Sequence, residues 1–151
     1  YQDRLKEFNA RMAAWRVTKA QEILQITNTL ESLANESAAK FFALNKMRPG
    51  TARVNEWRKY SAKYRKISDQ LALAIGRTAG EIEKSSFRSV AASLKAGLNL
   101  SEELHHAQNA YLGSTSPGNV RGEDVMASVR NLAGQLVAVI TKIKTAVAKP
   151  N

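Results

Sequence analysis

The chain has 151 residues, contains no cysteine and carries a formal net charge of +10 at pH 7. The lack of cysteine excludes disulfides, thiolate catalysis and cysteine-ligated metals. A composition of 44% hydrophobic and 24% charged residues excludes wholesale disorder, and this length predicts a single domain, residues 1–151. The uncharged run Asn131 to Thr141 is far too short to cross a bilayer, so no transmembrane segment is expected.

The first 46 residues repeat apolar side chains at spacings of three, four and seven, with no proline or glycine between them. This pattern predicts one amphipathic helix over residues 2–46, about 65 Å long at 1.5 Å per residue. Lys19 interrupts the apolar stripe, and its stem can lie along the stripe while its ammonium reaches water. The stripe consists of Leu5, Phe8, Met12, Trp15, Ile23, Ile26, Leu30, Leu33, Phe41 and Leu44.

Pro49 and Gly50 end that helix, and a second helix is predicted over residues 51–97. Because the connection is so short, the two helices are expected to be antiparallel neighbours. Folding the chain about Pro49 places three pairs together: Phe41 with Trp57, Ile23 with Ile75, and Trp15 with Ile82.

Ala72, Gly76 and Gly80 form a row of small residues on the second helix. A glycine inside a helix costs about 1 kcal/mol relative to alanine, so we expect a packing reason, namely a close crossing by the last helix. Beyond Ser85 the apolar positions rotate by more than about 100° around the helix axis. A continuous, bent helix is the preferred interpretation, and a break at Ser85–Ser86 is the alternative.

Gly97 to Asn99 are predicted to end this segment, and Ser101 to begin a short helix over residues 101–112. Gly113 to Gly122 form the obvious loop, with a turn at Pro117–Gly118, and a last helix follows over residues 123–148. No segment shows the alternation of a strand. The predicted fold class is therefore all-α, an elongated antiparallel bundle of three long helices and one short helix.

Candidate catalytic and metal-ligating residues are few. Glu102 and His105 match half of the Glu-x-x-His pattern of di-iron bundles, but the chain has no histidine for a second copy. His105 and His106 are interpreted as surface residues. The segment Gly113 to Gly118 resembles a phosphate loop but lacks the lysine and serine or threonine that should follow. We therefore expect no enzyme activity, no cofactor, no metal and no small-molecule substrate.

The second helix carries a row of cations that could follow a phosphate backbone. No aromatic side chain is interleaved with them for base stacking, so nucleic acid is the less favoured partner. The row consists of Lys59, Lys63, Lys66, Arg77 and Lys84.

The predicted first helix is longer than its partners can cover, so apolar surface at its start is expected to remain for another chain. Leu5, Phe8 and Met12 are the predicted partner interface. The leading functional hypothesis is a non-enzymatic structural or interaction protein, a subunit or accessory module of a larger assembly that binds a protein partner or itself. The sequence begins at Tyr1 rather than methionine, which indicates either a processed form or a trimmed chain. The larger assembly is expected to be exported or envelope-associated in a bacterium. The alternative is a basic-surface binder of nucleic acid or another polyanion.

Overall fold

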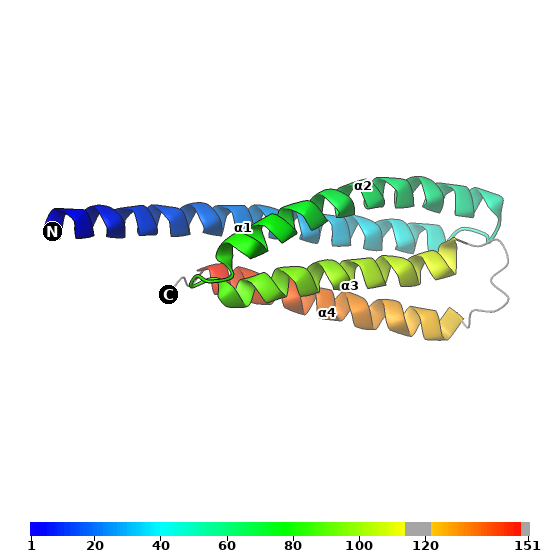
Figure 1. The fold of residues 1–151 in the computed structure, drawn as a ribbon. Helices are drawn as coiled ribbons and strands as arrows, with labels where there is room; N and C mark the ends of the chain where they lie inside the picture. The colour runs from blue at the N-terminus through cyan, green and yellow to red at the C-terminus, as the bar shows by residue number, and fades with distance from the viewer. Residues whose placement is uncertain (114–121, 149–151) are drawn as a thin grey trace.

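The computed structural model describes residues 1–113 and 122–148, which form four helices (Figure 1). They are α1 (Gln2–Asn45), α2 (Thr51–Ile82), α3 (Arg88–Leu112) and α4 (Gly122–Ala148). No strand occurs among the described residues, which confirms the all-α prediction. Most of the predicted loop Gly113–Gly122, including its Pro117–Gly118 turn, lies outside the described residues.

The four helices lie side by side, and each runs back along the one before it (Figure 1). α1 packs against the other three helices, and α3 packs against both α2 and α4. Within the described ranges α2 and α4 do not contact one another, so they occupy opposite corners of the bundle. The first part of α1 projects beyond the end of the bundle, where α2 and α4 end and α3 begins (Figure 1).

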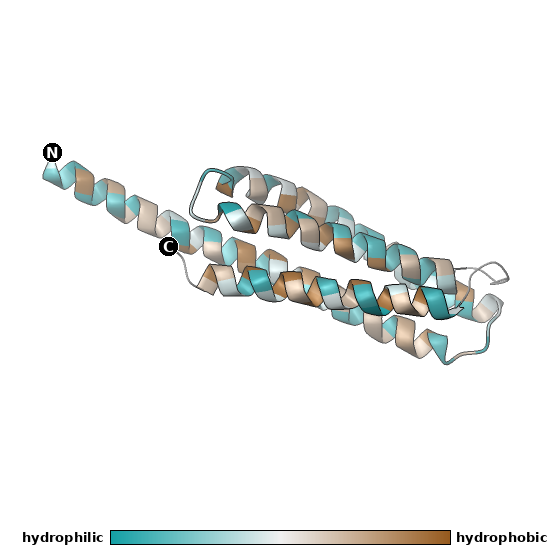
Figure 2. Cartoon of the chain, turned by 90° about the horizontal axis from the view of Figure 1, so that it is seen from below, coloured by the Kyte–Doolittle hydropathy of each residue, from teal (hydrophilic) through white to brown (hydrophobic). Residues whose placement is uncertain are grey.

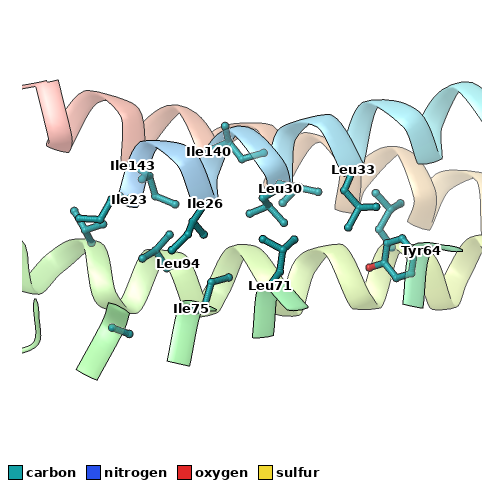
Figure 3. Close-up of a cluster of buried hydrophobic side chains, with 14 of the residues drawn as sticks. Ile23, Ile26, Leu30, Leu33, Tyr64, Leu71, Ile75, Leu94, Ile140 and Ile143 are labelled. Carbon is teal, nitrogen blue, oxygen red and sulfur yellow. The ribbon is translucent and has the colours of Figure 1, made fainter. Parts of the chain in front are cut away.

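A single cluster of buried apolar side chains contains residues from all four helices. Its middle is aliphatic: α1 contributes Ile23, Ile26 and Leu30, which meet side chains of the other three helices (Figure 3). Figure 2 shows hydrophobic and hydrophilic residues alternating along each helix, as expected for helices with one apolar face. Burying such a seam is what stabilises helices of this length, because propensity alone gives little.

The predicted continuous helix over residues 51–97 is wrong, and the alternative break is present. α2 ends at Ile82 and α3 begins at Arg88. The Ser85 hydroxyl donates a hydrogen bond to the Ile82 carbonyl oxygen (2.7 Å) and accepts one from the Phe87 backbone N–H (3.1 Å). Serine thus satisfies backbone groups that the helix releases, which is how serine competes with helical hydrogen bonding.

The predicted helix end at Gly97 to Asn99 and the separate short helix over residues 101–112 are also wrong, because both segments belong to α3. Gly97 is buried, and a Cβ at this position would lie 3.0 Å from Leu30 Cδ2 of α1 and 3.5 Å from Val139 Cγ1 of α4. The glycine therefore permits close packing inside the bundle rather than a helix stop. Residues 1–113 and 122–148 form four helices of 44, 32, 25 and 27 residues instead of three long helices and one short helix.

The predicted close crossing at Ala72, Gly76 and Gly80 is wrong as well. All three residues are exposed, and a Cβ at either glycine would meet nothing within 4 Å. α4 is the helix that α2 does not touch. The small residues follow the solvent side of α2, and nothing in the structure explains why two of them are glycine.

Candidate functional site

The first part of α1 projects from the bundle with no other described helix beside it (Figure 1). We call residues 2–18 the arm; none of them is buried. Leu5 and Phe8 have exposed fractions of 48% and 53%, and Met12 is partly exposed. The structure thus leaves the three predicted interface residues accessible.

Trp15 and Lys19 lie where the arm meets the bundle. Trp15 is partly buried and packs against the edge of the core. The Lys19 ammonium bonds to Glu81 near the end of α2 and to Glu22 (3.0 Å) in the next turn of α1. These carboxylates, Glu81 first, raise the pKa of Lys19 and outweigh the opposing effect of burial. The aliphatic stem is buried, as expected, but the ammonium bonds to carboxylates at the bundle's edge.

Four apolar residues form one narrow line along the arm: Leu5, Phe8, Met12 and Trp15, which we call the arm seam. At roughly 100° per residue the arm seam is about 80° wide and continues into the buried stripe of α1. Ile23, Ile26 and Leu30 occupy the same side of the helix and are buried by the other helices. The arm therefore presents the face that the bundle covers further along.

The charges of the arm are sorted around the arm seam. Arg4, Arg11 and Arg16 lie about 60–80° from its centre, at roughly 100° per residue, whereas Asp3 and Glu7 lie about 120–160° away. Side chains at such flanking positions are the ones that approach a helix packed on the seam. The sequence analysis did not identify these flanking arginines, although their spacing along the predicted helix would have placed them beside the arm seam.

All five cations of the predicted polyanion row are exposed. They do not form a uniform free surface, because Lys63 pairs with Glu36 of α1 (2.6 Å) and Lys59 approaches Glu56 (3.9 Å). Among the described residues no ion pair involves Lys66, Arg77 or Lys84. Lys84 lies beyond the last residue of α2, in the turn before α3.

The predicted contact between Phe41 and Trp57 is confirmed at the other end of the bundle. Both residues are buried, and their rings meet edge to face with 6.2 Å between centroids. The Trp57 indole N–H donates a hydrogen bond to Asn109 Oδ1 of α3 (3.1 Å). Two aromatic rings therefore close the hairpin as packing elements, as the sequence predicted.

His105 is buried in this aromatic region, so its interpretation as a surface histidine is wrong; His106 is exposed as expected. The His105 ring stacks on Tyr64 (3.8 Å between centroids) and on Trp57 (5.3 Å). Burial, and then the positive charges of Arg65 and His106, lower the pKa of His105 to about 4. The buried face of α3 continues from Val90 and Leu94 through Ser101 to His105. His105 was missed because the predicted separate helix over residues 101–112 hid this continuity.

The structure places Ser61 beside His105, with 2.8 Å between Ser61 Oγ and His105 Nε2. An activated serine needs its base oriented by a third group, but His105 Nδ1 has no partner in the described part of the chain. A stacked histidine with a pKa near 4 is also a weak base at neutral pH. We interpret the pair as part of the core packing.

A groove of about 480 Å³ lies between α1 and α2, next to the base of the arm. Its lining includes the apolar residues Ile26 and Leu71 and the charged residues Lys19, Arg77 and Glu81. Within the described ranges, no group of three or more histidine, aspartate or glutamate side chains is placed to hold a metal ion. None of the described helices combines the length and the apolar composition of a membrane span.

No family model, curated protein or solved structure matches this chain.

Proposed function

We propose that the chain is a non-enzymatic interaction protein, an elongated antiparallel bundle that serves as a subunit or accessory module of a larger assembly. The observation that supports this role is the arm. α1 has 44 residues, about 66 Å at 1.5 Å per residue, whereas α2 with 32 residues spans about 48 Å. The excess length carries the arm seam into solvent.

An uncovered apolar seam is costly to maintain, because exposed apolar surface favours association. Leu5 and Phe8 could be polar without loss to the bundle, since neither belongs to its core. Their apolar character is therefore explained by docking rather than by folding of this chain. The arm is the proposed docking element, and the bundle is the body that it attaches to the assembly.

The test compares the chain's native molecular mass in its source cells with that of arm variants. We expect the wild-type chain to fractionate well above its own 16.6 kDa and the double variant Leu5→Asp/Phe8→Asp to shift towards the monomer position. The matched control is Val17→Asp, on the arm's opposite face and 58% exposed, which should leave the distribution unchanged. A wild-type chain found only at monomer mass, or a double variant that still co-fractionates, would refute the role.

The second candidate function is binding of nucleic acid or another polyanion through the α2 row, supported by the exposure of all five cations. Neutralising about five phosphates should give a log–log salt slope near −4 to −5 on duplex DNA. The double variant Lys66→Glu/Lys84→Glu should weaken binding while leaving the ion pairs of Lys59 and Lys63 intact. Lys95→Glu/Lys142→Glu, exposed on other helices, is the control. Absence of DNA binding at about 50 mM salt would exclude this candidate.

A further inference from the structure

The geometry of the arm also specifies what kind of surface fits it. The arm seam is narrow, about 80° wide at roughly 100° per residue. A stripe formed by spacings of three and four alone is the seam of helix-on-helix packing in a coiled coil. Glu7 and Asn9 flank Phe8, and Met12 and Trp15 each have an arginine on one side and an alanine on the other. The arm therefore offers a line of large apolar side chains rather than a broad apolar face. A helix of matching seam fits such a line.

The arm seam is continuous with an interface that the bundle already uses. Beyond Lys19, the same side of α1 is covered by helices of this chain, which bury Ile23 and Leu30. Glu81, which accepts the bond from Lys19, is the last residue but one of α2. The first part of α1 projects beyond the end of α2 (Figure 1). A helix laid along the arm would therefore extend the bundle beyond the end of α2.

The charges that flank the arm seam disfavour a second copy of the arm as the helix that packs on it. In a parallel pair of arms, Arg11 of one copy would face Arg16 of the other, because these are the positions that meet across a seam. In an antiparallel pair, Arg4 would face Arg11. Both arrangements oppose cations, and the only acids of the arm, Asp3 and Glu7, point away. Like charges at these positions select against self-pairing.

We propose that the arm docks an amphipathic helix of another protein whose apolar seam is flanked by aspartate or glutamate. This inference rests on the proposed docking role and adds the chemistry of the partner. Apolar side chains of the partner cover Leu5, Phe8 and Met12, and its carboxylates meet Arg4, Arg11 and Arg16. The apolar contact supplies affinity, and the charges supply register and selectivity.

The test uses two synthetic three-heptad peptides with identical isoleucine and leucine seams. One carries glutamate at every flanking position and the other carries lysine. We measure binding to the full chain by calorimetry at about 50 mM and about 300 mM salt. The glutamate peptide should bind at least about 30-fold more tightly at low salt, as expected for three ion pairs gained against three repulsions. This preference should shrink at high salt.

Two single charge reversals provide the matched comparison. Arg11→Glu should weaken binding of the glutamate peptide about fivefold, because it replaces an attraction by a repulsion. Lys6→Glu changes the charge equally but lies about 140° from the centre of the arm seam, so it should change affinity less than about twofold. Both residues lie outside the core, so both variants should unfold at the parent's temperature.

Three results would overturn the proposal. Equal binding of the two peptides would show that the arginines select nothing. Binding to vesicles of phosphatidylglycerol and phosphatidylcholine, with neither peptide bound, would assign the arm to an anionic membrane surface. Sedimentation of the isolated chain as a dimer that Phe8→Asp dissociates would assign it to a second copy. If peptide binding fails while co-fractionation still depends on Leu5 and Phe8, the docking role stands and only the partner's chemistry is wrong.

Discussion

The two ends of α1 carry the same spacing of apolar side chains and have opposite surroundings. Between Ile23 and Leu44 the stripe is buried by the other helices, whereas Leu5 and Phe8 are about half exposed. Periodicity therefore identifies the face of a helix that packs, but not the molecule that it packs against. That second fact depends on the lengths of the neighbouring helices, and α2 ends where Glu81 meets Lys19.

The largest expected difference between the two ends is in stability. Trp57→Ala should lower the free energy of unfolding by about 3–5 kcal/mol, because it empties a fully buried site that contacts Phe41 and His105. Phe8→Ala removes a ring of the same chemical class from the arm and should change stability by less than about 0.5 kcal/mol. Denaturant unfolding of both variants measures the contrast. A large loss for Phe8→Ala would mean that the isolated chain already covers its arm.

The covered end should also respond to acid through His105. Its pKa is about 4 in the folded chain and about 6.5 when unfolded, so the unfolded chain takes up the proton first. The stability contributed by the neutral ring is complete above pH 6.5 and is lost as the pH falls towards 4. The loss reaches about 3 kcal/mol at most.

Measuring unfolding free energies between pH 7.5 and 4.5 isolates this contribution by comparison of variants. His105→Phe keeps an aromatic ring that does not titrate and should flatten the pH dependence. The exposed neighbour gives the control, since His106→Gln should keep most of the parent's slope. A His105→Phe curve parallel to that of the parent would contradict the buried neutral histidine.

The smallest expected effects come from two glycines, one uncovered and one covered. Gly76→Ala should stabilise the protein by about 0.5–1 kcal/mol, because the site is open and alanine is the better helix former. Gly97→Ala should give little or no gain, since its Cβ would require the Leu30 side chain to move. Thermal unfolding distinguishes the two. Equal gains would show that the α1–α3 contact is looser than described.

The sequence predicted α1, the hairpin at Pro49–Gly50 and the Phe41–Trp57 contact, because period and turn chemistry are local signals. The break after Ile82 was only the alternative interpretation, although the rotation of the apolar positions indicated it. No proline or glycine stands there, and the local bonds at the break are made by the Ser85 hydroxyl, a group that also occurs inside helices.

The structural roles of two glycines, Gly97 and Gly76, differ from those predicted, and for the same physical reason. Gly97 resembles a helix stop in the sequence, yet its missing side chain accommodates Leu30 from another helix. The spacing of Gly76 predicts a close crossing by another helix, yet this residue faces solvent. A glycine's role depends on what approaches it in space. Predicting that His105 is buried would have required extending α3 through Gly97. For the candidate site, the apolar residues of the arm were predictable from the sequence. The arginines that flank the arm seam became candidates for partner contacts only because the structure leaves the arm uncovered.

α1 passes from the bundle into the arm as one helix without proline or glycine. It therefore acts as a strut, and anything fastened to its tip is held at a set distance and bearing from the rest of the molecule. Each residue inserted between Trp15 and Lys19 would move the tip by about 1.5 Å and turn the arm seam by roughly 100°. Seven added residues would lengthen the strut by about 10 Å and nearly restore its bearing.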